Sequence, residues 1–179
     1  MLGGAIELTA RVLEDMSDTA AADIARAERL AGQAVAASAR SGLAHFAKGQ
    51  VLRTQHRYGE AIPEYEMALA CNRYCLGAYA PLGWCKLHTG SIDEVIPLAE
   101  QAIRLSPRDP LIGSWYSQAG AVHLLQSRTS EAIVWFEKAR SANPVHSIVY
   151  AHLASAYALK GETKHAAAER AEARRLKRQ

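Results

Sequence analysis

The stretch from Trp115 to Pro144, WYSQAGAVHLLQSRTSEAIVWFEKARSANP, decides the fold. Its first half places Tyr116, Ala119, Gly120 and His123 three or four residues apart, which is the spacing of one helix face. After a polar break at 126–130, its second half places Ala132, Phe136 and Ala139 on one face in the same way. The stretch therefore predicts two short helices joined by a turn.

The ends and the packing of this hairpin can also be predicted. Ser130 is the expected N-cap of the second helix, and Asn143–Pro144 should end it, because proline cannot continue a helix. The small pair Ala119–Gly120 lets another helix come very close, and the large Phe136 fills the space beside it. We expect such a hairpin to pack against copies of itself.

Copies of this pattern recur along the chain. The small residue of the first helix recurs at Gly49, Gly83, Gly120 and Ala154, in two equal steps on either side of one longer step. The longer step reflects a three-residue insertion within 108–112. The second helix also recurs, as GEAIPEYEMALACN, DEVIPLAEQAIRLSP, SEAIVWFEKARSANP and KHAAAERAEARRLKR. A period of about 34 residues with two helices per unit indicates a helical repeat protein.

The chain resembles the tetratricopeptide repeat (TPR) family. The family pattern falls in one unit on Tyr79, Gly83, Val95, Ala102 and Pro107, with Gly90 in the turn, and in the next on Tyr116, Gly120, Ala132, Phe136, Ala139 and Pro144. The resemblance implies an all-α fold, a right-handed alpha-alpha superhelix (TPR solenoid) of about five helix pairs. We expect residues 1–179 to form a single solenoid with units at about 8–41, 42–75, 76–112, 113–146 and 147–179. The first of these units is degenerate, with a predicted first helix at 8–16.

Composition narrows the class of protein. The 179 residues suffice for one domain or a short repeat array, and the net charge of +3 does not by itself imply nucleic acid. The three cysteines show no framework pattern, which suits a reducing compartment. The sequence has no apolar run of about 18 residues. We therefore expect a cytoplasmic protein that contacts neither membrane nor nucleic acid.

No catalytic constellation is visible, so we expect a non-enzymatic protein without cofactor or metal. Its histidines are scattered, and none pairs with a second ligand at helical spacing. Cys71 and Cys75 are four residues apart near a helix end, and a zinc site would need further close ligands. We expect these two cysteines to be small buried hydrophobes.

The resemblance implies a binding surface, because the first helices of a solenoid line its concave side. It assigns eight candidate groove residues: Phe46, Gln50, Arg53, Trp84, His88, Gln118, His152 and Ser155. Trp84 suits either the groove or the core. The mixed polar and apolar surface suits an extended peptide, a helix or a partner domain. The Lys and Asn clamp with which some family members bind chaperone tails is absent from these positions, so that ligand is not expected.

A second interpretation is a regulatory or oligomerising segment of a larger signalling protein. Residues 102–125 resemble the repeat region that follows nucleotide-cyclase or winged-helix domains in some alphaproteobacterial regulators. An unsealed end would expose apolar surface and favour a homodimer through the terminal helices.

The last helix leaves two interpretations open. Its cations are Lys164, Arg170, Arg174, Arg175, Lys177 and Arg178. They fit a solvated cap or a basic contact surface for an acidic partner. If Ala166, Ala171 and Leu176 are solvated the helix is a cap, and if they pack on a second chain it is an interface.

Overall fold

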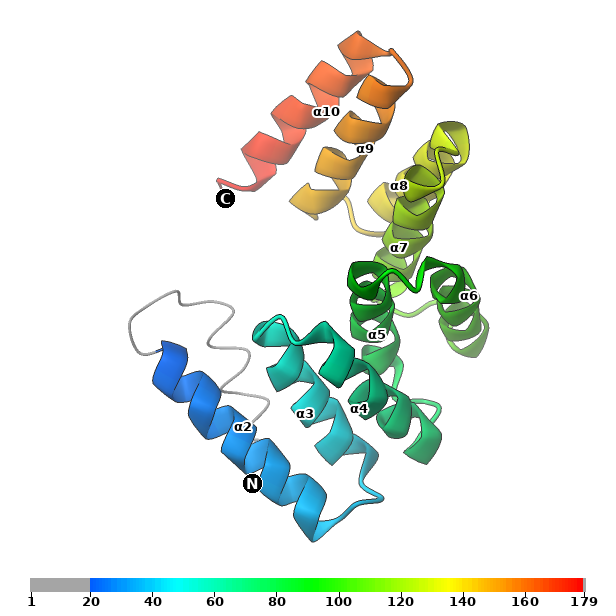
Figure 1. Ribbon diagram of the computed structural model, residues 1–179. Coiled ribbons are helices and arrows are strands. Elements are labelled where there is room, and N and C mark those ends of the chain that lie inside the picture. The colour runs from blue at the N-terminus through cyan, green and yellow to red at the C-terminus, as the bar shows by residue number, and fades with distance from the viewer. Residues whose placement is uncertain (1–19, 179) are drawn as a thin grey trace. The chain divides into compact units, whose positions relative to one another are not determined.

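The computed structural model describes residues 20–178, which form nine α-helices and one short 3-10 helix (Figure 1). The first four helices are α2 (Ala20–Ala37), α3 (Gly42–Thr54), α4 (Tyr58–Cys71) and α5 (Leu76–Thr89). They are followed by η1 (Ile92–Glu94), α6 (Val95–Leu105), α7 (Ile112–Leu125), α8 (Thr129–Ala142), α9 (Ser147–Leu159) and α10 (Thr163–Leu176). The helix predicted at 8–16 lies outside the described residues.

The chain divides into two compact units, Met1–Ser91 and Ile92–Gln179, which we call unit 1 and unit 2. In unit 1, α3 packs on α4, and α2 and α5 pack at either end of this pair. In unit 2, α7 packs on α8 and α9 packs on α10, while α6 contacts α7 and α8 contacts α9. The all-α class is confirmed, as is the pairwise packing of successive helices in the manner of a TPR superhelix.

One left-handed residue lies in each of four short turns between successive helices. These residues are His56, Gly90, Ser127 and Gly161, with φ of 59°, 87°, 60° and 83°. Their spacing along the chain repeats that of the small residues, with the longer step again in the middle. Gly90 is in the turn as predicted, and it takes the left-handed conformation that glycine adopts without steric cost.

The ends of α8 differ partly from expectation. The helix ends at Ala142, directly before Asn143–Pro144, as predicted. It begins at Thr129, so the prediction of Ser130 as N-cap was wrong, and Arg128 stands there without a side-chain capping bond. The Arg128 N–H donates to the His123 carbonyl across 2.8 Å, which closes the turn early, and the helix begins two residues sooner than predicted.

The close contact predicted inside the hairpins is present in both units. A Cβ atom added to Gly120 would lie 2.6 Å from two ring atoms of Phe136. In unit 1, a Cβ atom on Gly49 would lie 2.8 Å from the ring of Tyr65. Real Cβ atoms do not approach so closely, so these two positions accept only glycine without movement of the ring.

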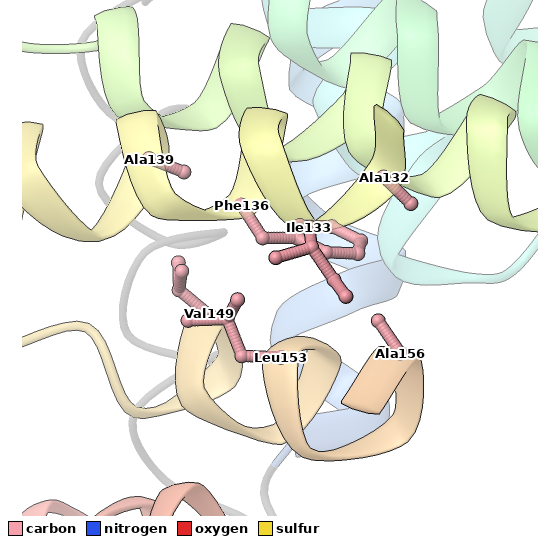
Figure 2. Packing of buried hydrophobic residues seen from close by; sticks show 7 residues of the cluster. All are labelled: Ala132, Ile133, Phe136, Ala139, Val149, Leu153 and Ala156. Atoms are coloured by element: carbon pink, nitrogen blue, oxygen red, sulfur yellow. The ribbon is translucent and has the colours of Figure 1, made fainter. Parts of the chain in front are cut away.

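Packing between hairpins uses the outer face of the second helix. In unit 2, α8 contributes Ala132, Ile133, Phe136 and Ala139, and α9 contributes Val149, Leu153 and Ala156 (Figure 2). All seven are buried. Within residues 20–178, no helix is both long and apolar enough to cross a bilayer.

Candidate functional site

Three of the predicted groove residues lie on α3 in unit 1. Phe46 is half-buried, with its ring centroid 6.2 Å from that of Tyr65 and its edge against Gly77 of α5. Phe46 therefore helps to pack α3 against α4 and α5. Gln50 and Arg53 are half-buried and form part of a polar cluster beside it.

The polar cluster is built around the hydroxyl of Tyr65. This hydroxyl donates to Gln50 Oε1 across 2.6 Å, and Arg53 Nε donates to the same oxygen across 3.3 Å. The Tyr65 side chain is fully buried, and burial raises the pKa of its hydroxyl. Gln50 and Arg53 are thus held in place by a buried neighbour while still reaching the surface.

The two predicted groove residues of α5 lie in different surroundings. Trp84 is half-buried. His88 is exposed, and its ring stacks on that of Tyr58 with centroids 4.4 Å apart and planes 10° apart. His88 is therefore a solvent-facing residue whose ring orientation is fixed by α4.

In unit 2 the predicted residues differ strongly in exposure. Gln118 on α7 is fully buried, at 0% exposure. His152 on α9 is half-buried, with Nδ1 3.3 Å from the Ser117 hydroxyl and its ring centroid 5.0 Å from that of Phe136. Burial lowers the pKa of His152, and nearby His146 lowers it further. Ser155 is exposed, one turn further along α9.

The structure therefore brings together only part of the predicted set. Gln50 and Arg53 are joined by a side-chain hydrogen bond, and His152 and Ser155 are neighbours on one helix. Gln118 belongs to the interior. The predicted polar residues that are exposed or half-buried are Gln50, Arg53, His88, His152 and Ser155.

A charged cluster on the α3/α4 hairpin carried no signal in the sequence. Glu64 accepts from Lys48 Nζ at 2.6 Å and lies 2.6 Å from Nδ1 of the buried His45. Burial opposes ionisation of Glu64, but the hydrogen bonds from Lys48 and His45 outweigh it and lower its pKa. The pairing depends on which face of α4 meets α3, so spacing along one helix could not reveal it.

The cysteines correct one expectation. Cys71 is exposed and Cys75 half-buried, so the prediction that both are buried was wrong for Cys71, the last residue of α4. Cys85 is buried, and burial raises its pKa to about 11. In the part of the chain that the structure describes, no group of three or more His, Cys, Asp or Glu residues could hold a metal ion.

A groove between α9 and α10 is a further feature of unit 2, and Ser155 is the one predicted groove residue that lines it. It has a volume of about 750 Å³ and is lined mainly by alanine, serine and threonine residues of both helices. Arg170, Arg174 and Lys177 stand along its α10 side. The basic run is visible in the sequence, but the hollow beside it results from the small size of residues on two helices.

Comparisons with known proteins rest on the fold. No protein-family model matches the chain, and no curated protein matches it. PilF of Pseudomonas aeruginosa matches with a TM-score of 0.79 at 19% identity, over 98% of this chain and 76% of that one. MamA of Desulfovibrio magneticus RS-1, from residue 41 to its end, matches with a TM-score of 0.74 at 17% identity, over 99% and 95%.

A third solved structure names the repeat type. YrrB, described as a TPR protein with an unusual peptide-binding site, matches with a TM-score of 0.64 at 18% identity, over 96% of this chain and 93% of that one. At such identities the likeness concerns the fold alone. The repeat period, the glycine–aromatic contacts and these matches agree, and the chain has the fold of tetratricopeptide repeat proteins.

Proposed function

We propose that the chain is a non-enzymatic protein-interaction module that binds a peptide or a partner domain on the faces of its first helices. The observation that carries this proposal is the cluster of Gln50, Arg53 and Tyr65. The buried tyrosine hydroxyl fixes a glutamine and an arginine at half-exposed positions. Polar groups held in this way lose little conformational freedom when a ligand binds.

The surroundings of this cluster fit a peptide. Arg53 supplies a fixed cation, and on α5 the stacked ring of His88 supplies an exposed aromatic surface. A mixture of donors and aromatic surface suits extended or helical segments. In unit 2, His152 and Ser155 on α9 are proposed as a second contact region, with the buried Gln118 supporting α7 from within. The solved structure of YrrB, a TPR protein with a peptide-binding site, supports a peptide as ligand.

A pull-down from a lysate of the source organism tests this proposal. The baits are the wild-type chain, an Arg53→Glu/His88→Glu variant, and an Arg29→Glu control on the exposed surface of α2. Circular dichroism first confirms that all three are folded. We expect a protein retained by wild type and control and lost with the double variant. Equal recovery on all three baits would contradict the assigned face.

The alternative, a regulatory or oligomerising segment of a larger signalling protein, predicts a different result. Sedimentation velocity of the chain alone would show a dimer, and the double variant would leave it intact. No contact among the described residues favours this alternative over the binding module.

A further inference from the structure

The groove between α9 and α10 is the open counterpart of a surface that is filled elsewhere in unit 2. On α8, the face formed by Ala132, Ile133, Phe136 and Ala139 is buried beneath α9 (Figure 2). A shift by one repeat period carries these positions to Ala166, Ala167, Arg170 and Ala173 on α10. All four line the groove, and no residue of α10 is buried.

The filled surface shows what the open one is shaped to receive. A helix, α9, lies on α8 and inserts Val149, Leu153 and Ala156, which follow one another at helical spacing. The ring of His152 lies over Phe136 in the same contact. The groove on α9 and α10 therefore has the shape of a binding site, or seat, for one more helix. That helix would carry a stripe of aliphatic and small residues facing the groove.

Charge distinguishes the open seat from the filled one. Arg170 stands where the filled seat has the apolar Phe136, and Arg174 and Lys177 follow along the same edge. Among the described residues these three cations form no ion pair. Their neighbours do, since Glu169 pairs with Arg140 and Glu172 pairs with Arg175. A helix bound in this groove would lie beside these three cations and would be stabilised by carboxylates that pair with them.

We propose that the α9/α10 groove binds an acidic amphipathic helix of a partner protein, with aliphatic or small residues on the groove floor and a carboxylate facing Arg170. This proposal goes beyond the contact face on α3 and α5, because none of its residues lies there. The groove shares Ser155 with the second contact region proposed on α9. The pull-down with the Arg53→Glu/His88→Glu variant changes only α3 and α5, so it tests the proposed function separately from the groove.

A second copy docked symmetrically fits this surface less well than an acidic partner. In a two-fold interface the same patch meets itself. Two α10 edges would then bring Arg170, Arg174 and Lys177 of both copies together. Like charges in such a contact disfavour association.

A synthetic helix provides the probe. It carries the α9 sequence Ser147–Leu159 with His152→Glu. Its apolar residues are the ones with which α9 packs on α8. Because His152 lies over Phe136, the new carboxylate should lie over Arg170, the equivalent residue of α10. Fluorescence anisotropy of the labelled peptide is measured against the full chain. We expect saturable binding that weakens at least tenfold with Arg170→Glu and weakens as salt is raised.

Two controls make the result specific. Lys164→Glu makes the same charge change on α10 away from the groove lining and should bind as wild type. A peptide with His152→Lys should bind the Arg170→Glu variant better than the wild type, which shows that this variant is folded and that the two positions face each other.

Three results would overturn the proposal. One is the absence of saturable binding. Another is equal binding to wild type and Arg170→Glu, which would mean that the peptide replaces α9 on α8. The third is a dimer of the chain in sedimentation velocity that is lost with Arg170→Glu, which would make a second copy the occupant.

Discussion

The α3/α4 hairpin of unit 1 and the α7/α8 hairpin of unit 2 are two repeats apart in the sequence, with the three-residue insertion between them. When they are aligned, Gly49 corresponds to Gly120 and Tyr65 corresponds to Phe136. In both, the aromatic ring lies directly over the glycine, so that an added Cβ atom would clash. Both rings are fully buried. The backbone approach is therefore the same in the two hairpins.

The surroundings of the two rings differ in a consistent way. The tyrosine hydroxyl of α4 meets Gln50, with Arg53 beside it. The same shift places Ala121 and Leu124 at these positions in unit 2, where both pack on the apolar cluster around Phe136. A buried hydroxyl needs a hydrogen-bond partner and a phenyl ring does not. In each hairpin the neighbours therefore match the ring, with polar residues beside the tyrosine and apolar residues beside the phenylalanine.

A second pair of equivalent positions repeats this lesson. On α3 and α4, His45 and Glu64 form a charged contact that includes Lys48. The equivalents of the first two in unit 2 are Tyr116 and Trp135, whose ring centroids lie 5.8 Å apart. One geometry thus accepts either a hydrogen-bonded histidine–carboxylate pair or an aromatic pair.

The largest effect is expected where the two hairpins agree. Gly120→Ala and Gly49→Ala should each lower the free energy of unfolding by about 1–3 kcal/mol, because the new methyl overpacks a rigid ring contact. Urea unfolding followed by circular dichroism measures this loss. Gly59→Ala on α4 is the control. Its Cβ atom would meet nothing within 4 Å, so it should gain up to about 1 kcal/mol from helix propensity. Equal stability of Gly120→Ala and wild type would contradict the shared contact.

The next test removes the partner of the tyrosine hydroxyl. Gln50→Ala should cost about 1–3 kcal/mol, because it leaves a buried hydroxyl without its acceptor. Tyr65→Phe added to this variant should recover most of the loss in urea unfolding. Additive losses in the double variant would show that Gln50 and Tyr65 are not coupled.

The converse substitution introduces the hydroxyl into unit 2. Phe136→Tyr should cost about 1–2 kcal/mol, because the equivalent neighbour is Ala121 and offers no side-chain acceptor. Adding Ala121→Gln should restore part of the stability, as measured by the thermal midpoint. If Phe136→Tyr is neutral, the apolar surroundings do not select the phenyl ring.

A pH series separates the charged pair from the aromatic pair. Glu64 has a pKa lowered below its ordinary value of 4.5, so its stabilisation is present above that value and is lost as the pH falls through the folded-state pKa. We expect Glu64→Gln to cost about 1 kcal/mol at pH 7 and progressively less as the pH falls below 4.5. Thermal melts from pH 3 to 7 measure the difference. A cost that is constant with pH would rule out the charged contact as its source.

The smallest effect is expected in the turns. Ser127→Gly should gain up to about 1 kcal/mol, because glycine takes the left-handed conformation without steric cost. His56→Gly should gain less, since it also loses the 2.7 Å contact between His56 Nδ1 and the Tyr58 hydroxyl. Thermal midpoints compare the two, and a larger gain for His56→Gly would reverse this ranking.

The features that depend on period could be predicted from the sequence. Gly120 beneath Phe136, the turn at Gly90 and the end of α8 before Asn143 follow from spacing and from the conformations of glycine and proline. The candidate site depends instead on which neighbour covers each face. Periodicity placed Gln118 on a first-helix face but could not show that it is fully buried.

Of the residues that line the groove on α9 and α10, only Ser155 was predicted, for the same reason. Arg170 reads as one cation in a basic run, and its position on an uncovered seat emerges only when α8 and α10 are compared in three dimensions. The start of α8 was misplaced because a left-handed serine closed the turn, a conformation that sequence patterns assign to glycine. The role of the candidate residues in binding stays a prediction.

The positions of the cysteines and tryptophans allow the unfolding of each unit to be followed separately. All three cysteines lie in unit 1, and Cys71, Cys75 and Cys85 run from exposed to buried. Thiol labelling of Cys85 therefore requires unit 1 to open, because its thiol is both covered and held protonated. Trp115 and Trp135 lie in unit 2, so with Trp84→Phe the tryptophan emission, excited selectively, follows unit 2 alone. Alkylation kinetics and fluorescence on one sample would then show whether the units unfold together or one before the other.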